Sequence, residues 1–407
     1  MSAPSQIAHL SAHDASFRQR LAAAPDDAIR HAGLTLTDGE TRALHATHAL
    51  LARTPHDLMT LSVDGPDWQG IEGSLPAALT ASPGVEVWID AVERQAIMAL
   101  RRATPATHLR CDLEWLWQAT TAPRAAARPF LLLFYFACEA AGGDGQHTTG
   151  AAAAWSLLHL AARLQDDLAD NHESAVVNHL GTARTATLAT SLIFAATSAL
   201  SQATNGEAVP AARRLALHTA FAGAGMTLCE AQYEEASDRA APLDGSKGAV
   251  ALGLACWAGG LLAGAPAATC EALREFGTSL GLLMQLSDDL QDFFRPDDND
   301  LRAGRASLVL QLTTQLPPTP LRARLTTLFD GRALSEAQAE EVRRLVVAMG
   351  GLHHWLLVSA QVRDAALSVL GDLRLCGAAQ PAIAALAALL DLFTPWAAPR
   401  VAAPTGQ

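Results

Sequence analysis

Hydrophobic residues recur with helical spacing along most of this chain. From Val85 to about Phe393 one segment of this kind follows another, and Gly, Pro and short polar turns separate them. No stretch of useful length alternates apolar and polar residues as a half-buried strand does. Many of the segments are apolar on most of their faces, which is typical of the inner helices of a large bundle. The pattern therefore predicts an all-α fold.

The N-terminal part has its own organisation. An amphipathic segment over 17–31 is followed by Gly33, which is placed as a C-terminal cap, and Thr37 with Glu40 forms a capping box that starts a second helix. Residues 54–84 are rich in Pro, Gly, Ser and Asp and show no sustained period. We predict a small helical extension over 1–53, a linker over 54–84, one main helical domain over 85–395 and a tail over 396–407.

The composition supports helices and narrows the choice of partners. Ala and Leu dominate the 407 residues while Tyr and Phe are scarce, which argues against a large sheet. The formal net charge of −12 comes without a basic block, so we expect no nucleic-acid partner. Six cysteines are scattered without a Cys-x-x-Cys pair, and the N-terminus lacks a basic start followed by an apolar run. A cytoplasmic protein is the simplest expectation.

One uncharged segment, GAVALGLACWAGGLLAGAPAA at 248–268, is nearly long enough to cross a membrane. It is rich in Ala and Gly rather than in Leu. We therefore expect a helix that is buried in the bundle instead of a transmembrane span, in a protein that is not an integral membrane protein.

Two clusters of aspartates stand out in a chain in which only 17% of the residues are charged. RLQDDLADN occupies 163–171 and QLSDDLQDF occupies 285–293, and both lie in helical patterns with apolar flanks. Residues four apart project from the same face of a helix. Each cluster therefore places three carboxylates together: Asp166, Asp167 and Asp170 in the first, and Asp288, Asp289 and Asp292 in the second.

Carboxylates that crowd on one apolar helix repel each other, so we expect a cation beside them. Oxygen ligands with this much charge suit Mg²⁺, which keeps several waters and usually shares its site with a phosphate. Two such clusters on either side of a bundle cavity would hold a diphosphate and help to break the carbon–oxygen bond of an allylic diphosphate. An apolar pocket below would shelter the carbocation from water. Two solvated acidic faces are the alternative, and the apolar flanks argue against it.

These motifs resemble those of the polyprenyl synthetase family, the trans-isoprenyl diphosphate synthases of the class I isoprenoid synthase fold, over residues 85–395. LLHLAARLQDDLAD, with His159 seven residues before Asp166, is similar to the first aspartate-rich motif, and MQLSDDLQD is similar to the second. AQYEE at 231–235 resembles the family's Gly-Gln-x-x-Asp. The resemblance implies an isoprenoid synthase bundle around a central apolar cavity, three Mg²⁺ ions per active site on the six aspartates, and a homodimer.

The resemblance also implies residues that bind diphosphate. GSKGAVALGLACWAG is similar to the segment that supplies a diphosphate-binding lysine, here Lys247, which is the only lysine in the chain. A compact ammonium on a phosphate is not fully replaced by a guanidinium. Arg128 takes the position of the arginine that binds the second diphosphate, Gln285 takes the Phe-Gln position, and Arg305 stands where the family has lysine.

Other positions depart from the family pattern. The family follows its first motif with Arg-Arg-Gly, which binds the allylic and homoallylic diphosphates, whereas NHESAVVNHLG has Ala175 and Val176 there. TAPRAAARP keeps Arg128 but has no lysine, and Arg124 is one position off. Gln165 replaces the usual histidine before the first aspartates. The residues that ionise the allylic diphosphate are therefore complete, while those that bind the second substrate are reduced.

Three functions remain open on this basis. A prenyltransferase that elongates an allylic diphosphate with isopentenyl diphosphate fits the overall similarity and is our prediction. A terpene cyclase, which needs one allylic diphosphate alone, fits the loss of the arginine pair. A non-catalytic partner subunit is the third interpretation, and the two complete clusters argue against it. Ala161 and Ala162, where bulky aromatics in the family close the pocket, either leave room for a substrate of C15 or longer or are ordinary alanines at a helix contact.

Two further groups give weaker indications. His45 and His48 lie one turn apart without an evident Cys, Asp or Glu partner, so we expect a solvated helix face rather than a metal site. Trp155 and Trp257 are expected in the core, although an aromatic ring beside a cation pocket would stabilise a carbocation.

Overall fold

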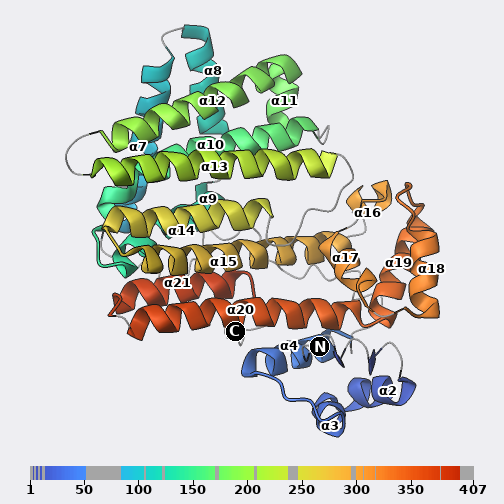
Figure 1. Cartoon of the computed structure of the whole chain (residues 1–407). Coiled ribbons are helices and arrows are strands. Elements are labelled where there is room, and N and C mark those ends of the chain that lie inside the picture. Colours follow the sequence, from blue (N-terminus) through green and yellow to red (C-terminus); the bar gives the residue numbers. More distant parts are fainter. Residues whose placement is uncertain are drawn as a thin grey trace, which may run out of the picture. The chain divides into compact units, whose positions relative to one another are not determined.

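The computed structural model describes residues 3, 6–7, 10–11, 14–51, 84–104, 107–121, 124–169, 174–205, 209–236, 246–294, 299–305, 307–316, 318–375 and 377–394. All regular structure in these ranges is helical, and none of it is a strand (Figure 1). The all-α prediction is confirmed. The chain divides into two compact units, which are Pro66–Leu282 with Ala366–Leu389, and Met1–Gly65 with Leu283–Ala365 and Leu390–Gln407.

The first of these, the α10 unit, is a bundle of long helices. Its elements are α7 (Val85–Ala103), α8 (Thr107–Thr121), α9 (Arg124–Ala140), the short 3₁₀ helix η2 (Gly145–Thr148), α10 (Thr149–Ala169), α11 (Ala175–Leu180), α12 (Thr182–Ala203), α13 (Ala211–Ala236) and α14 (Lys247–Ala263). Three more helices contribute residues to both units: α15 (Ala267–Phe294), α20 (Gly351–Leu375) and α21 (Gln380–Leu392).

Helix α10, which carries the first aspartates, is packed on a run of small residues. The five residues from Gly150 to Ala154 are all buried. A Cβ atom added to Gly150 would overlap the side chain of Ala203 in α12, so the two helices approach more closely than a larger residue would allow. Close-packed interiors resist such displacement, because even one additional methylene is felt by the neighbours. This packing fixes the helix whose last turns hold Asp166.

Helix α14 covers most of the uncharged segment that is nearly of membrane length. Eleven of its residues, from Gly248 to Gly260, are buried. Gly259 lies so close to α9 that a Cβ atom there would be 2.7 Å from the carbonyl oxygen of Phe134. The prediction of a helix buried in the bundle is therefore confirmed. Among the described residues no single helix is long and apolar enough to cross a membrane. The helices Glu336–Ala348 and Gly351–Arg374, which are bent by 63° relative to each other, reach that length and apolar composition only when taken together.

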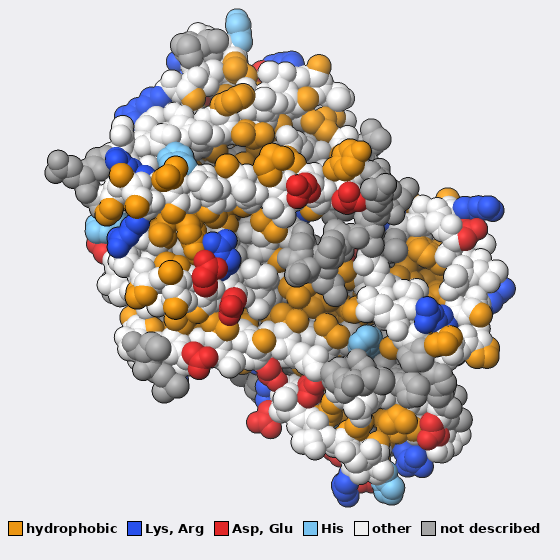
Figure 2. Space-filling model, in the orientation of Figure 1, with side chains coloured by type: hydrophobic (Ala, Val, Ile, Leu, Met, Phe, Trp, Pro, Cys, Tyr) orange, Lys and Arg blue, Asp and Glu red, His pale blue; other side chains and the backbone are white. Residues whose placement is uncertain are grey.

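Helix α13 presents apolar side chains to the outside. Leu215, Met226 and Tyr233 are 69%, 62% and 70% exposed. They are spaced by eleven and seven residues, which places them on one face of the helix. The space-filling view shows hydrophobic side chains along this helix (Figure 2). These three side chains form an apolar row on the surface, unlike the scattered apolar residues of an ordinary exposed helix.

The second unit, the α17 unit, is made mainly of shorter helices. They are α2 (Ala15–Ala23), α3 (Pro25–His31), α4 (Asp38–Leu51), α16 (Asn299–Ala303), α17 (Leu308–Thr314), α18 (Pro320–Leu328) and α19 (Glu336–Ala348), together with the parts of α15, α20 and α21 that lie in this unit.

The predicted capping box at the start of α4 is confirmed. The backbone N–H of Thr37 donates to Glu40 Oε2 at 2.8 Å, and the backbone N–H of Glu40 donates to Thr37 Oγ1 at 3.1 Å. The same two side chains also reach α20, because Thr37 Oγ1 donates to Asp364 Oδ2 at 2.8 Å and Gln361 Nε2 donates to Glu40 Oε1 at 3.0 Å. The cap therefore fixes the N-terminal helix to α20 as well as starting it.

One prediction about the N-terminal helices was wrong in part. His45 Nε2 lies 2.8 Å from Asp26 Oδ1, so this histidine does have an acidic partner, on α3. The partner was missed because it is 19 residues away in sequence. Both side chains are at least half exposed, in agreement with the predicted solvated face. The division into extension, linker, main domain and tail stays a prediction, since residues 54–83 and 395–407 lie outside the described residues.

Candidate active site

The first aspartate cluster lies at the C-terminal end of α10. Asp166 and Asp167 occupy its last turns and are both half-buried, and the helix ends at Ala169. Asp170, the third predicted carboxylate, lies outside the described residues. Asp166 and Asp167 lie in a helix, as predicted, while the placement of Asp170 one turn after Asp166 stays a prediction.

The single lysine of the chain meets this cluster. Lys247 is the first residue of α14, and its Nζ lies 3.1 Å from Asp166 Oδ1. The same Nζ donates to the amide oxygen of Gln232 on α13. The lysine side chain is 26% exposed and the aspartate 35% exposed, so solvent screens this ion pair only in part. Three motif segments, from α10, α13 and α14, therefore converge on one ammonium group.

Gln232 was not among the predicted site residues. It is the glutamine of AQYEE, the segment that resembles Gly-Gln-x-x-Asp, so the motif did contain the information. Its partner could not be read from the sequence, because Gln232 and Lys247 are brought together only when α13 and α14 pack.

Close helix packing places Lys247. Ser246 caps α14, since its side chain accepts from the backbone N–H of Ala249 at 3.3 Å. A Cβ atom on Gly281 of α15 would overlap the backbone of Gly248, so α15 lies directly against the first turn of α14. The glycine at 281 therefore allows the approach that sets the start of α14.

We expect Gly281→Ala to lower the free energy of unfolding by about 1–3 kcal/mol, because the added methyl group overpacks two backbones that cannot both move away. Urea unfolding followed by circular dichroism measures the change. Gly371→Ala in α20 is the matched control, since nothing lies within 4 Å of its Cβ position and alanine favours the helix. Equal stability of the two variants would contradict the proposed role of Gly281.

The second aspartate cluster lies near the end of α15, in the α17 unit. Asp288 and Asp289 are half-buried and Asp292 is exposed. Both oxygens of Asp289 accept hydrogen bonds, since Gln285 Nε2 donates to Oδ1 at 3.1 Å and the backbone N–H of Leu308 donates to Oδ2 at 2.7 Å. The predicted diphosphate ligand Gln285 thus bonds to an aspartate of the cluster in this structure.

The buried Arg343 of α19 is a second residue that the sequence did not single out. It is 4% exposed, and its Nε donates to the carbonyl oxygen of Phe293 in the last turn of α15, at 2.7 Å. A cation at the C-terminus of a helix is favourable. Arg343 therefore secures the end of the helix that carries Asp292.

Of the two arginines predicted to bind diphosphate, the structure describes the side chain of only one. Arg305 follows α16 and Gly304, which has φ = +82°, and is half-buried. Arg128 lies in the first half of α9, and its side chain falls outside the described residues. Where the family has its arginine pair, Ala175 begins α11 and Val176 is 8% exposed. The indole of Trp115 in α8 stacks on the imidazole of His179 in α11, with ring centroids 4.2 Å apart.

The donor set fits magnesium. Its candidate ligands are all carboxylate oxygens, which are the ligands that this ion prefers. The contact between Lys247 and Asp166 shows that the first cluster presents a carboxylate to a cation. Among the described residues, which do not include Asp170, no group of three or more His, Cys, Asp or Glu is arranged as a metal site. The fit to magnesium therefore rests on the chemistry of the donors and on this contact.

Two aromatic rings stack on α10 before the aspartates. The imidazole of His159 lies parallel to the indole of Trp155, at an angle of 2° and a centroid distance of 5.0 Å. Trp155 Nε1 donates to the carbonyl oxygen of Ala251 in α14 at 3.2 Å, which fixes the indole. Both Trp155 and Trp257 are buried, as predicted. Ala161 is buried and Ala162 half-buried, so the chain has no bulky side chain at these two positions.

Burial lowers the pKa of His159 from 6.5 to about 4, with a smaller contribution from the nearby charge of Arg163. Between these two values the unfolded chain binds a proton that the folded protein does not, so stability rises with pH across this window. We expect acidification from pH 7 to pH 5 to cost about 2 kcal/mol through this group. Urea unfolding at both pH values should show a smaller loss for His159→Gln than for the wild type. The exposed His108→Gln is the control, and an equal loss in all three proteins would contradict the assignment.

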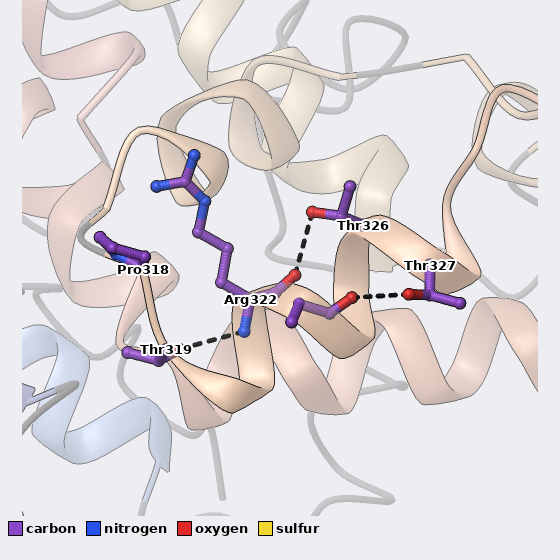
Figure 3. Close-up of a pocket in the computed structure, with 6 residues that line it drawn as sticks. Pro318, Thr319, Arg322, Thr326 and Thr327 are labelled. Carbon is purple, nitrogen blue, oxygen red and sulfur yellow. Dashed lines mark hydrogen bonds between the residues drawn. The ribbon is translucent and has the colours of Figure 1, made fainter.

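A surface pocket on α18 is not part of this chemistry. It has a volume of about 450 Å³, and its lining residues are Pro318, Thr319, Arg322, Ala323, Thr326 and Thr327 (Figure 3). The hydroxyl groups of Thr326 and Thr327 donate to backbone carbonyls of their own helix, and Thr319 caps it. Its polar groups therefore serve the local structure, and it contains none of the predicted site residues.

The solved structures that this chain resembles are prenyl synthases. Geranylgeranyl pyrophosphate synthase from Corynebacterium glutamicum, complexed with calcium and isoprenyl diphosphate, aligns with a TM-score of 0.61 at 22% identity, over 79% of this chain and 98% of that one. Polyprenyl synthetase from Streptomyces coelicolor A3(2) aligns with a TM-score of 0.60 at 20% identity, over 76% and 98%. The likeness shows the all-α isoprenoid synthase fold.

The fold is that of the isoprenoid synthase class, and the family match and relatives that follow make the chain a prenyltransferase. Geranylgeranyl diphosphate synthase of Mycobacterium tuberculosis is 29% identical over 330 residues, which are 74% of this chain and 91% of that protein. (2E,6E)-farnesyl diphosphate synthase of Mycobacterium bovis is 27% identical over 255 residues, 58% and 70% of the two chains. The profile of the polyprenyl synthetase family matches residues 116–349, and the chain belongs to this family.

Proposed function

We propose that this chain is a magnesium-dependent prenyl diphosphate synthase, which ionises an allylic diphosphate and joins its carbon chain to isopentenyl diphosphate. The observation that carries the proposal is the convergence of Asp166, Lys247 and Gln232 from three helices. The relatives named as geranylgeranyl and farnesyl diphosphate synthases support the reaction class. The Corynebacterium structure, with calcium and isoprenyl diphosphate, supports a divalent cation and an isoprenoid diphosphate ligand.

The proposed ligands of three Mg²⁺ ions are carboxylates of both clusters: Asp166, Asp167 and Asp170 in the first, and Asp288 and Asp292 in the second. When bound, Mg²⁺ neutralises the charge that develops on the diphosphate as the carbon–oxygen bond breaks. Lys247 contacts the same diphosphate. Its ammonium is already held at the first cluster, so little reorganisation is needed when the substrate binds. Arg128 and Arg305 contact diphosphate oxygens as well.

The bond at the allylic carbon breaks and its electron pair leaves with the diphosphate. The double bond of isopentenyl diphosphate then supplies the electrons of the new carbon–carbon bond, and a proton leaves as a double bond forms again. Water must be excluded, because it would trap the allylic cation as an alcohol.

A terpene cyclase is the second candidate, because the buried Val176 and its neighbour Ala175 supply no charge for a second diphosphate. Purified protein with Mg²⁺ and geranyl, farnesyl or geranylgeranyl diphosphate, with and without isopentenyl diphosphate, separates the two functions. A diphosphate five carbons longer that forms only with the second substrate supports our proposal. A hydrocarbon or alcohol from one substrate means a cyclase. No turnover with any combination means a non-catalytic subunit.

We also propose that the chain is a homodimer and that a second copy covers the apolar row on α13. We expect light scattering to give twice the chain mass of 42.7 kDa. Met226→Glu should shift the protein toward the monomer, because it places a charge in the buried centre of the interface. Glu86→Gln on α7, an exposed change away from this row, is the control. A monomer in the wild type at micromolar concentration would contradict the proposal.

A further inference from the structure

The Asp289 carboxylate joins two segments of the α17 unit. It belongs to α15, and its Oδ2 accepts the backbone N–H of Leu308, the first residue of α17, at 2.7 Å. A second side chain completes this end of α17, since Ser307 Oγ accepts from the backbone N–H of Leu310. The first N–H groups of a helix have no partner within the helix, so such side chains decide where it starts. Asp289 therefore fixes the beginning of α17 to α15.

The segment that precedes α17 is also fixed at its other end. The backbone N–H of Leu334 donates to the carbonyl oxygen of Arg302 at 2.7 Å. Gly304, at φ = +82°, makes the turn, and a Cβ atom there would meet the carbonyl oxygen of Arg332. Arg305 lies between these two anchors, three residues before Leu308. Three residues span at most about 10 Å, so the backbone of Arg305 stays within this distance of the helix start that Asp289 holds.

Asp289 and the preceding Asp288 point in different directions from α15. Successive residues of an α-helix are turned by about 100° around its axis, so Asp288 and Asp289 leave the helix in different directions. The side chain of Asp289 is directed to α17, and Gln285, one turn earlier, donates to its other oxygen. Both oxygens of this carboxylate are engaged by the protein itself.

We propose that Asp289 is a positioning residue, which holds Arg305 for the diphosphate, and that Asp288 and Asp292 are the carboxylates of this cluster that bind magnesium. Gln285 orients the Asp289 carboxylate. The proposal deepens the proposed function, on which it rests, and divides the second cluster by role. Asparagine separates these two roles. Its amide oxygen can still accept the backbone N–H, but it lacks the negative charge that binds a metal ion.

Hydrogen exchange in the metal-free protein without substrate tests the contact. We expect the Leu308 amide to exchange at least about tenfold faster in Asp289→Ala, since the bond to a charged acceptor is lost. Asp289→Asn should restore most of the protection, and Asp288→Asn should leave this amide unchanged. Unchanged exchange in Asp289→Ala would overturn the proposal. This readout does not depend on activity, so it holds even where the proposed function fails.

Steady-state kinetics test the role. Asp289→Ala should raise KM for the allylic diphosphate about tenfold or more and leave the Mg²⁺ concentration for half-maximal rate near that of the wild type. Asp288→Asn should raise that Mg²⁺ concentration. The effects of Asp289→Ala and Arg305→Met should be strongly non-additive, because the first acts through the second. A higher Mg²⁺ requirement in Asp289→Asn, equal to that of Asp288→Asn, would make Asp289 a metal ligand and overturn the proposal. Additive effects of Asp289→Ala and Arg305→Met would overturn the proposal that Asp289 acts through Arg305.

Discussion

Replacing Asp166 by alanine is expected to lower kcat with an allylic diphosphate by about 10³-fold, and Asp288→Ala is expected to do the same. Each change removes a carboxylate that brings positive charge to the leaving diphosphate. The binding of substrate should suffer less than the chemical step, because the charge to be stabilised develops mainly as the bond breaks. Initial rates at saturating substrate, over a range of Mg²⁺ concentrations, measure the effect.

Asp90→Ala is the matched control for these two variants. Asp90 is an exposed aspartate on α7, a helix that carries neither cluster, so its loss should leave the rate unchanged. Circular dichroism should show the same helix content in all three variants. Rates within tenfold of the wild type for both Asp166→Ala and Asp288→Ala would remove the clusters from the mechanism.

Replacing Lys247 by methionine is expected to lower kcat/KM for the allylic diphosphate by about 10²-fold or more. Methionine keeps much of the length of the side chain and removes its charge, so Asp166 and Gln232 lose their shared partner. Lys247→Arg should recover only part of the activity, because a planar guanidinium does not fit the place of a compact ammonium between these two groups.

The sequence offers a direct check on the position of this ammonium. Because Lys247 is the only lysine in the chain, an amine-directed reagent can modify only this side chain and the N-terminal amine. Mass spectrometry of the modified peptide should show that inorganic diphosphate with Mg²⁺ protects Lys247, while the N-terminal amine gives the internal control. Equal modification with and without diphosphate would place the lysine outside the diphosphate site.

Local rules predicted the parts of this protein that depend on neighbours in the sequence. Helical periodicity gave the all-α fold, and the spacing of Thr37 and Glu40 gave a cap that the structure contains. The Ala/Gly-rich composition of 248–268 pointed to a buried helix, and α14 is one. The same reasoning gave the helical placement of Asp166 and Asp167. Each of these features is fixed within a few turns of one helix.

Tertiary contacts account for what the sequence did not predict. Gln232 meets Lys247 only because α13 packs on α14, and Asp289 reaches the backbone of Leu308, which is 19 residues later in the sequence. A carboxylate in an Asp-Asp-x-x-Asp motif looks like a metal ligand whichever way it points, so the motif alone could not separate Asp288 from Asp289. Knowledge of which backbone N–H lies opposite each carboxylate was needed.

The departures from the family pattern have a structural counterpart. At the two positions where the family has cations, Val176 is buried and Ala175 carries no charge, and His179 of the same helix stacks on Trp115. Packing of this kind requires no charge on the helix. The second diphosphate must then be bound by other groups, of which Arg128 is the one we propose.

A crystal structure with Mg²⁺ and an allylic thiolodiphosphate, which cannot ionise readily, tests the central claim most directly. We predict metal ions that join Asp166 on α10 and Asp288 on α15 to the oxygens of one diphosphate, with the Lys247 ammonium on the same group. A diphosphate bound to one cluster alone, or aspartates that bind no metal when the ligand is present, would contradict the account.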